Sequence, residues 1–259
     1  PGRGIVFRLP FFLRGPTLSA RPHLKPLKPG GDTHFRYFAS LSSRMFRPAC
    51  CALPIPDNQL AFSALELHPT LLRGVEDLGF VRPTPIQSHA IPHALEGRDL
   101  LACAATGSGK TAAFILPILH HLMDRSRGTT RALVLAPTRE LALQIRDDFI
   151  GLARHTRLTA AAVHGGVAMG PQERAFRKGA DVIIATPGRL LDHFQYGYAA
   201  MSGLEYLVLD EADRMLDMGF LPDIRRILRH VPSPKQTFFF SATMPPSIEA
   251  LTRQILRAP

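Results

Sequence analysis

From about Asp57 onward, short apolar runs rich in β-branched residues alternate with stretches in which apolar residues recur at helical spacing. The runs typical of buried strands are Asp99–Cys103, Ala132–Ala136, Leu158–Val163, Asp181–Ala185, Tyr206–Leu209 and Thr237–Ser241. The helical patterns cover Thr111–Asp124, Arg139–Ala153, Gln172–Lys178, Leu190–Phe194, Arg214–Leu216, Pro222–His230 and Ser247–Leu256. This alternation predicts an α/β fold, with a mostly parallel sheet flanked by helices on both faces. Ligands are expected at the carboxyl ends of the strands.

Residues 1–56 do not follow this pattern, and we expect them to form a disordered basic tail rich in Pro and Arg. Closely spaced prolines exclude a long helix there: Pro1, Pro10, Pro16, Pro22, Pro26 and Pro29. Because the first methionine is Met45, the segment before it is expected to be an upstream artefact or otherwise not native. A flexible arm that helps to hold RNA is one alternative. A mitochondrial targeting segment is another, although the prolines argue against its amphipathic helix.

The net charge of +10 suggests a nucleic-acid partner, but its distribution weakens that argument. Residues 1–55 hold nine Lys or Arg and one acidic residue, whereas the remainder holds 22 basic and 20 acidic residues. The part predicted to fold is therefore nearly neutral. The overall charge does not by itself indicate that this part binds RNA.

Apolar runs and cysteines bear on where the protein works. No run approaches the roughly 20 apolar residues of a membrane-spanning helix, so no membrane partner is expected. The cysteines are Cys50, Cys51 and Cys103, and nothing with zinc spacing follows the adjacent pair. We expect reduced thiols in a cytoplasmic protein, with a metal site or a disulfide as the alternative.

A segment rich in glycine and small residues follows the first predicted strand and leads into a helix. It reads Ala104-Ala105-Thr106-Gly107-Ser108-Gly109-Lys110-Thr111. Glycine lets the backbone curl so that successive N–H groups point at phosphate oxygens, and the helix N-terminus adds partial positive charge. Lys110 can reach the β- and γ-phosphates and the Thr111 hydroxyl can ligate Mg²⁺, which predicts an ATP-binding P-loop. Ala104 departs from the usual first glycine, and an ordinary helix start is the alternative.

An acidic run follows another predicted strand about a hundred residues later. It reads Asp210-Glu211-Ala212-Asp213. At the carboxyl end of a strand beside a P-loop, Asp210 can hold Mg²⁺ through water, and Glu211 can orient and deprotonate the attacking water. A solvated turn would explain the acids alone, but not the apolar strand before them. Together the two segments predict an ATP–Mg²⁺ site in which Lys110, Asp210 and Glu211 are catalytic.

With these segments the chain resembles DEAD-box ATP-dependent RNA helicases, whose name is spelled by residues 210–213. The resemblance covers about residues 61–259 and implies a RecA-like P-loop domain. Ser241-Ala242-Thr243 matches the family's coupling motif. In that family this motif contacts the last aspartate of the box, which implies that Ser241, Thr243 and Asp213 link nucleotide state to RNA binding. Stretches such as Leu190–His193 and Met215–Phe220 look most like bacterial members termed RhlE-like.

The segment Gly79-Phe80-Val81-Arg82-Pro83-Thr84-Pro85-Ile86-Gln87 matches the Q motif of the same family. The resemblance implies that the Gln87 amide reads the adenine edge as donor and acceptor, which makes ATP the nucleotide. An aromatic residue 17 positions before the motif's glycine stacks on adenine in the family, and Phe62 occupies that place. Arg82 is a second implied adenine contact. Taken alone, Phe62 would be read as a core residue and Arg82 as a surface charge.

Three further loops follow predicted strands and match RNA-facing motifs of the family. Since the carboxyl ends of parallel strands share one rim of a sheet, we expect these loops to lie together. Their N–H groups, hydroxyls and guanidinium groups suit a sugar–phosphate backbone, although each arginine alone could be a surface ion-pair partner. No aromatic platform for bases is apparent, which favours sequence-independent binding of RNA. The predicted RNA contacts are Thr138, Arg139, Gly165, Gly166, Thr186, Gly188 and Arg189.

The expected organisation is a tail over residues 1–56, the Q motif over 60–88 and the helicase ATP-binding RecA-like domain over 91–259. Family members carry a second RecA-like lobe that supplies arginines to the transferring phosphate, and we expect it in the full-length protein. An arginine finger contributes on the order of 10³–10⁵ in rate. We therefore expect this chain alone to bind ATP weakly, hydrolyse it very slowly and unwind nothing. The alternatives are an ATP-gated RNA clamp, a P-loop ATPase acting on DNA, or a truncated product.

Overall fold

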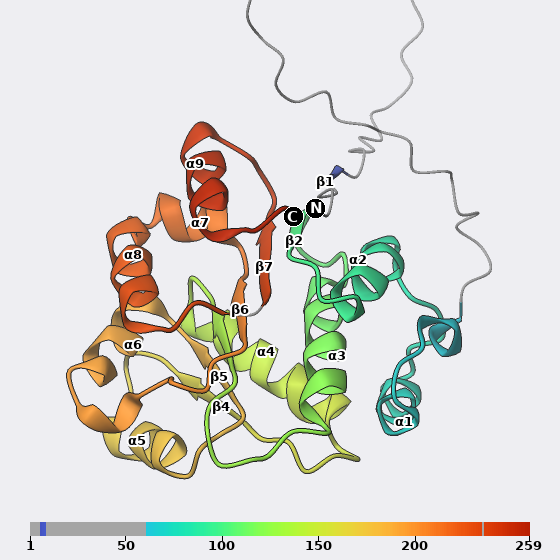
Figure 1. The fold of residues 1–259 in the computed structure, drawn as a ribbon, viewed down its shortest axis with the longest axis horizontal. Helices are drawn as coiled ribbons and strands as arrows, with labels where there is room; N and C mark the ends of the chain where they lie inside the picture. Colours follow the sequence, from blue (N-terminus) through green and yellow to red (C-terminus); the bar gives the residue numbers. More distant parts are fainter. Residues whose placement is uncertain (1–5, 9–60, 235) are drawn as a thin grey trace, which may run out of the picture. The chain divides into compact units, whose positions relative to one another are not determined.

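A computed structural model describes residues 6–8, 61–234 and 236–259 (Figure 1). These residues contain a seven-stranded sheet whose paired strands are all parallel, in the order β1-β2-β7-β6-β3-β5-β4. The strands are β1 (Val6–Arg8), β2 (Leu100–Cys103), β3 (Ala132–Leu135), β4 (Ala160–Val163), β5 (Val182–Ala185), β6 (Tyr206–Leu209) and β7 (Gln236–Ser241).

Helices connect successive strands. They are α1 (Pro69–Asp77), α2 (Pro85–Leu95), α3 (Lys110–Leu122), α4 (Arg139–Leu152), α5 (Met169–Arg177), α6 (Pro187–Phe194), α7 (Ala212–Asp217), α8 (Leu221–His230) and α9 (Pro246–Ile255). The short 3₁₀ helices are η1 (Phe62–Leu65) and η2 (Gly197–Ala199). The predicted α/β fold is confirmed, and each of the predicted strands β2–β7 lies within about two residues of its expected ends.

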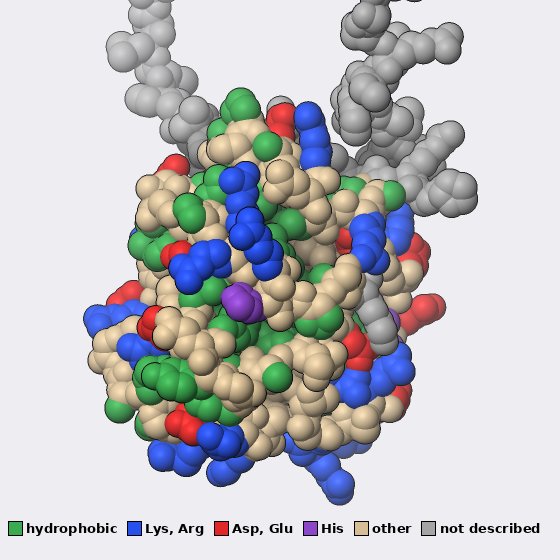
Figure 2. Space-filling model, turned by 60° about the vertical axis from the view of Figure 1, so that its left-hand side comes forward, with side chains coloured by type: hydrophobic (Ala, Val, Ile, Leu, Met, Phe, Trp, Pro, Cys, Tyr) green, Lys and Arg blue, Asp and Glu red, His purple; other side chains and the backbone are tan. Residues whose placement is uncertain are grey.

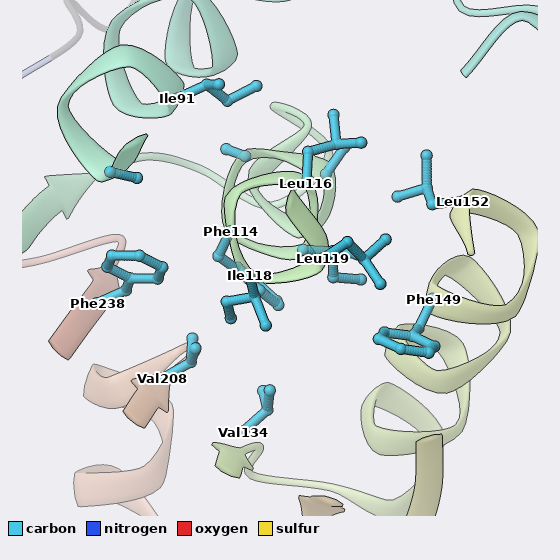
Figure 3. Close-up of a cluster of buried hydrophobic side chains, with 14 of the residues drawn as sticks. Ile91, Phe114, Leu116, Ile118, Leu119, Val134, Phe149, Leu152, Val208 and Phe238 are labelled. Carbon is cyan, nitrogen blue, oxygen red and sulfur yellow. The ribbon is translucent and has the colours of Figure 1, made fainter. Parts of the chain in front are cut away.

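Two hydrophobic cores lie on opposite faces of the sheet, because successive residues of a strand point to opposite sides. Val134, Val208 and Phe238 are paired across β3, β6 and β7, and they belong to the core that contains buried residues of α1 to α4. Figure 3 shows α3 in this core, with Phe114 and Ile118 near these strand residues. The neighbouring strand positions face the second core, which contains buried residues of α6 to α9.

Helices α1 and α2 were not predicted. Proline occupies a first-turn position of both, where its missing N–H costs nothing. The His68 ring accepts a hydrogen bond from Thr70 N (3.2 Å), and the Gln87 side chain accepts one from Thr84 N (3.0 Å), which stabilises each helix start. Helix α2 packs on α3, carries Pro92 inside and has only a weak amphipathic stripe. Apolar spacing in the sequence therefore did not reveal this helix.

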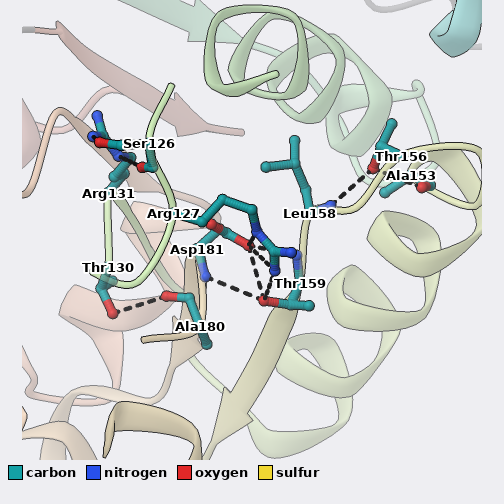
Figure 4. Close-up of polar contacts among 10 residues, drawn as sticks. All are labelled: Ser126, Arg127, Thr130, Arg131, Ala153, Thr156, Leu158, Thr159, Ala180 and Asp181. Atoms are coloured by element: carbon teal, nitrogen blue, oxygen red, sulfur yellow. Dashed lines mark hydrogen bonds and ion pairs between the residues drawn. The ribbon is translucent and has the colours of Figure 1, made fainter. Parts of the chain in front are cut away.

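The rim of the sheet where the strands begin is held by polar contacts to the buried Asp181, which precedes β5 (Figure 4). The Asp181 carboxylate accepts hydrogen bonds from Thr159 N (2.8 Å), Thr159 Oγ1 (2.9 Å) and Arg127 Nη2 (3.1 Å). Nearby, Thr130 Oγ1 donates to Ala180 O (2.9 Å). These contacts tie the loop before β3 to the starts of β4 and β5.

Most of the predicted tail lies outside the described residues, as do Met45, Cys50 and Cys51. The part of the predicted tail that the structure describes, Val6–Arg8, forms β1, which pairs with β2 at the edge of the sheet. A strand in the tail was not expected. In the part of the chain that the structure describes, no helix combines the length and the apolar character needed to cross a membrane.

Candidate functional site

The predicted P-loop connects β2 to α3. Gly107 and Gly109 have φ of +81° and +92°, a backbone region that residues with a Cβ rarely adopt. A Cβ on Gly109 would lie 2.6 Å from Gln87 Nε2, so this position also needs glycine because the loop packs against the Q motif. The buried Lys110 ammonium donates to Ala104 O (3.1 Å) across the turn.

The acidic run follows β6 and meets the P-loop. Thr106 Oγ1 donates to Glu211 Oε1 (3.0 Å), which joins residues 105 positions apart. Asp210 Oδ1 lies 3.9 Å from Lys110 Nζ. Glu211 precedes α7 with φ +50° and ψ +51°, a left-handed conformation that is uncommon for a residue other than glycine and frequent at functional sites. The sequence prediction that these two segments form one site is therefore supported by their geometry.

Asp210 is buried, and its surroundings change its acidity. Burial raises the pKa of Asp210 to about 6, while the Lys110 charge lowers it and the neighbouring Glu211 raises it further. Its Oδ1 accepts a hydrogen bond from Glu211 N (3.0 Å). A carboxylate of this kind is stabilised by added positive charge, so the site has the electrostatic character of a cation ligand.

The donor set fits a nucleotide phosphate with a hard cation. Lys110 offers a buried positive charge, and Thr111, Asp210 and Glu211 offer the oxygen atoms that Mg²⁺ prefers. Ser108 Oγ is buried and has no hydrogen-bond partner among the described residues, although it lies in the phosphate loop. A cavity of about 230 Å³ lies beside these groups. Its lining residues are Leu78, Phe80, Gln87, Thr106, Gly107, Gly109, Lys110, Thr111, Ala112, Leu141, Gln144, Asp148, Leu152, Asp210 and Glu211.

The Gln87 amide bridges two elements in this structure. Its oxygen accepts from Thr84 N (3.0 Å) at the start of α2, and its Nε2 donates to Gly109 O (3.0 Å) in the P-loop. An amide oxygen has a second lone pair and an amide nitrogen a second hydrogen. Gln87 can therefore hold the P-loop and still offer a donor and an acceptor to an adenine edge, and that contact stays a prediction.

The aromatic wall of the cavity differs from the one expected. Phe80, of the Q motif, lines the cavity, whereas Phe62 is buried and stacks on Phe80 with ring centroids 6.3 Å apart. Arg82 is exposed and does not belong to the lining residues. The adenine contacts of Phe62 and Arg82 thus stay predictions, and Phe80 is an aromatic lining residue of the cavity that the sequence prediction passed over.

Helix α4 itself was predicted, but its contribution to the wall of the cavity was not. Leu141, Gln144, Asp148 and Leu152 all line it. Their spacing of three or four residues places them on one helical stripe. The signal was present in the sequence, but a stripe of mixed polarity is equally typical of a helix that packs on a neighbour, as α4 packs on α3.

The three predicted RNA loops lie together after β3, β4 and β5, which are neighbours in the sheet. The Arg139 guanidinium lies 3.5 Å from the Cβ position of Gly166, and Arg189 Nη1 donates to Val167 O (2.9 Å). Thr138 Oγ1 accepts from Leu141 N (3.2 Å) and caps α4. Thr186 N donates to Val163 O (2.9 Å) and holds the third loop to the end of β4, while Gly188 follows it in the first turn of α6. The expected common rim is confirmed.

The predicted coupling residues are also in contact. Asp213 Oδ2 accepts hydrogen bonds from Ala242 N (3.1 Å), Thr243 N (2.8 Å) and Thr243 Oγ1 (2.9 Å). Burial alone would raise the pKa of Asp213, but the bonds from Thr243 hold it below its usual value. Asp213 N donates to Ser241 Oγ (3.3 Å). The loop after β7 is thereby tied to the start of α7 beside Glu211.

Comparisons with known proteins agree with these features. Residues 84–251 match the family described as DEAD/DEAH box helicase. "ATP-dependent rRNA helicase RRP3" of Candida albicans is 48% identical over 79% of this chain and 39% of that protein. "ATP-dependent RNA helicase DeaD" of Escherichia coli is 46% identical over 78% and 32%, respectively. "DEAD-box ATP-dependent RNA helicase 14" of Arabidopsis thaliana is 43% identical over 79% and 34%. The chain thus spans about a third to two fifths of the length of these relatives.

Proposed function

The chain belongs to the DEAD/DEAH box helicase family, and from that premise we propose that it is the nucleotide-binding lobe of an ATP-dependent RNA helicase. The observation that carries this proposal is the contact between the P-loop and the acidic run, Thr106 Oγ1 to Glu211 Oε1 at 3.0 Å, beside the buried Lys110. A phosphate loop and a pair of carboxylates at one cavity are the parts that phosphoryl transfer requires.

Each part has a role in this proposal. The N–H groups from Ala105 to Gly109 and the Lys110 ammonium bind the phosphates, and Gln87 orients the base. Thr111 and Asp210 would hold Mg²⁺, which when bound supplies positive charge to the phosphate oxygens. Glu211 accepts the proton of the attacking water. The left-handed backbone at Glu211 is consistent with a carboxylate held in place for this purpose.

The rest of the proposed machinery lies on the same rim of the sheet. The three loops around Arg139, Gly166 and Arg189 bind the RNA sugar–phosphate backbone without reading its sequence. The contact between Asp213 and Thr243 transmits the nucleotide state to the RNA-binding side. Joined to a second RecA-like lobe, the chain couples ATP hydrolysis to local unwinding of an RNA duplex, whereas the chain alone hydrolyses ATP very slowly.

Substitution of the proposed base tests the chemistry. In a protein that carries both lobes, Glu211→Gln should leave binding of a fluorescent ATP analogue nearly unchanged and lower phosphate release by about 10²–10⁴, the usual contribution of a general base. Glu249→Gln, which changes a partly exposed acid on α9, is the matched control and should have no effect. Turnover that survives Glu211→Gln would show that this residue is not the base.

A second pair of measurements addresses the substrate. Strand displacement from a short RNA duplex separates a helicase from an ATP-gated clamp, which would bind RNA and ATP without displacing a strand. Competition between RNA and DNA of the same sequence should favour RNA through its 2′-hydroxyls. Equal binding of the two would favour an enzyme that acts on DNA.

Two finer predictions are kept as part of this proposal. Similarity to RhlE-like members rests on the stretches Leu190–His193 and Met215–Phe220. A cytoplasmic location rests on cysteines without the spacing of a zinc site or a disulfide framework.

A further inference from the structure

A second hollow, larger than the nucleotide cavity, lies along α5. Its volume is about 810 Å³, and it shares no lining residue with the nucleotide cavity. Met169, Glu173 and Arg177 line it at intervals of four residues, which places them on one face of α5. The other lining residues are Gln195, Tyr196, Gly197 and Tyr198. We call this hollow the α5 groove. Its first lining residue, Met169, lies three positions after Gly166, which belongs to one of the predicted RNA loops.

The far end of the α5 groove carries an aromatic stack. The rings of Tyr196 and Tyr198 are nearly parallel, with centroids 5.6 Å apart and an interplanar angle of 8°. The Arg177 guanidinium lies 5.1 Å from the centroid of the Tyr198 ring. Tyr196 is 52% exposed, which leaves ring surface open to a further flat group. The sequence predicted no aromatic platform for bases, but the stacked tyrosine pair has the geometry of such a platform.

A buried chain of hydrogen bonds connects this stack to the predicted RNA loop. The Tyr198 hydroxyl bonds to His193 Nδ1 (2.9 Å), and His193 Nε2 bonds to Gln172 Oε1 (3.1 Å). Because an amide oxygen only accepts, His193 Nε2 carries the hydrogen and the tyrosine hydroxyl donates to Nδ1. Burial lowers the pKa of His193, which agrees with this neutral ring.

The chain ends at the loop itself. Gln172 Nε2 donates to His164 O (3.1 Å), and His164 immediately precedes Gly165 and Gly166. Both Gln172 and His193 are buried, so the tyrosine pair is held in a fixed position relative to the loop. On the other side, Arg189 Nη1 holds Val167 O of the same loop.

We propose that the α5 groove binds single-stranded RNA that extends beyond the three predicted RNA loops, with one base stacked on Tyr196 and a phosphate near Arg177. This inference rests on the proposed function. Aromatic rings beside a cation are the usual surface for stacked bases, and such stacking accepts any base. The α5 groove therefore lengthens the binding site without making it sequence-specific.

Charge and lining favour RNA over a protein partner. Arg177 lines the groove and is paired with the lining Glu173, and Arg174 and Lys178 add positive charge on the same stretch outside the lining. Figure 2, in which the side of the molecule left of the sheet in Figure 1 comes forward, shows scattered groups of Lys and Arg side chains on that face, with some Asp and Glu side chains among them. A groove for an amphipathic helix would need an apolar lining, whereas Met169 is the one aliphatic side chain among the lining residues here.

Binding measured against RNA length tests the inference. The probes are fluorescein-labelled oligouridines of roughly 4 to 16 nucleotides, the range of site sizes for single-strand binding. Tyr196→Ala should weaken binding of the longest RNA by about fivefold or more and leave the shortest unaffected, since one stacked base is lost. Tyr196→Phe keeps the ring and should retain the affinity. Arg139→Ala, in a predicted RNA loop, should weaken binding at every length.

Matched controls separate the groove from general surface effects. Arg177 and Arg253 both form exposed ion pairs with a glutamate four residues away. Arg177→Ala should weaken binding of long RNA, and Arg253→Ala on α9 should not. Ile150→Ala, at an exposed apolar position on α4, is the corresponding control for Tyr196→Ala.

Intrinsic fluorescence gives a second readout, because the chain has four tyrosines and no tryptophan. In a Tyr37→Phe background the emission comes from Tyr196, Tyr198 and the buried Tyr206. Long RNA should quench this emission and the shortest RNA should not, since a base stacked on Tyr196 quenches it. Tyr196→Phe should remove most of the quenching.

The outcomes distinguish this inference from the proposed function. If Tyr196→Ala binds RNA of every length as the parent does while Arg139→Ala does not, the groove inference is wrong and the proposed function stands. If the parent chain binds no RNA at any length, both are overturned. If Tyr196→Ala changes only self-association in sedimentation, the groove is a protein interface and the inference fails.

Discussion

Each rim of the sheet holds a buried aspartate, and the two differ in how many hydrogen bonds their carboxylates accept. Asp181, 1% exposed, precedes β5 and accepts hydrogen bonds from both the backbone and the side chain of Thr159 and from Arg127. Asp210, 2% exposed, follows β6, accepts one from Glu211 N and lies 3.9 Å from the Lys110 ammonium. Burial without matching partners raises the pKa of Asp210 to about 6.

This difference separates a fully hydrogen-bonded carboxylate from a weakly paired one. A buried charge that is fully hydrogen-bonded stabilises the position of its neighbours, whereas one with few donors lowers the stability of the fold. The rim with the less satisfied carboxylate also carries the left-handed Glu211 and the buried Ser108 hydroxyl, which has no hydrogen-bond partner among the described residues. Strained or weakly paired groups at one rim are typical of a binding site, and the opposite rim supplies the rigidity that holds them.

Among the substitutions that compare the two rims, Asp210→Asn has the largest expected effect. In the two-lobe protein, ATP turnover should fall by about 10²–10³, the usual cost of losing one electrostatic contact to a reacting group. In EDTA the melting temperature should stay the same or rise, because a poorly paired buried charge is removed. Phosphate release and thermal melting measure the two effects. A variant that loses both activity and several degrees of stability would show that Asp210 is structural, as Asp181 is.

Asp181→Ala should give the reverse result. It removes the carboxylate that accepts hydrogen bonds from Arg127 and from the backbone and side chain of Thr159, and the free energy of unfolding should fall by about 3 kcal/mol. Affinity for a fluorescent ATP analogue, measured well below the melting temperature, should not change. Urea denaturation followed by circular dichroism measures the loss. Unchanged stability would contradict the division between the rims.

Gly109→Ala tests how closely the phosphate loop is fitted to the Q motif. The left-handed backbone alone costs about 1–2 kcal/mol with a Cβ, and here the Cβ would also displace the Gln87 amide at 2.6 Å and the Thr84 hydroxyl at 2.9 Å. Gly107→Ala is the control, since it has φ +81° and no described atom within 4 Å of its Cβ position. Denaturation without nucleotide should show a greater loss for Gly109→Ala, and equal losses would contradict it.

The smallest effect is expected for Thr243→Val. It removes one hydrogen bond to Asp213 (2.9 Å) and leaves the two backbone donors, so stability should fall by only about 1 kcal/mol. ATP affinity should be retained, while stimulation of turnover by RNA should decrease in the two-lobe protein. Thr252→Val on α9 also removes a local hydroxyl bond and is the control. If the two variants respond equally to RNA, the contact with Asp213 does not couple the sites.

Much of the fold was predictable because its signals are local. The runs that became β3, β5, β6 and β7 are buried on both faces, so they read as continuous apolar stretches between amphipathic helices. Helix α2 was missed because it has only a weak apolar stripe and its start depends on proline and a side-chain cap. Helix α1 was missed although Leu71 and Val75, both buried, are spaced as on one helical face, so that signal was available in the sequence. The expected boundaries of the tail and of the Q motif segment stay predictions.

The residues of the candidate nucleotide site also divide into those that the sequence predicted and those that it did not. Gly107, Gly109, Lys110, Asp210 and Glu211 were identified because a glycine-rich turn between a strand and a helix and an acidic run after an apolar strand occur together, although each alone has an ordinary explanation. Phe80 and the α4 stripe were missed, since their residue types are equally typical of ordinary packing. Only the folded chain shows that Phe62 stands behind Phe80 and that Gln87 supports the P-loop.

The sequence by itself determined the α/β class, the phosphate loop, the acidic pair and the loops on one rim, because each is encoded by residues that are close along the chain. The tertiary structure alone decided which distant residues meet: Thr106 with Glu211, Arg139 with Gly166, and the tyrosine pair with the loop after β4. The physical reason is that a contact between distant residues depends on the register of the parallel strands and on helix packing. These are set by both hydrophobic cores together, and no single segment of the sequence records them.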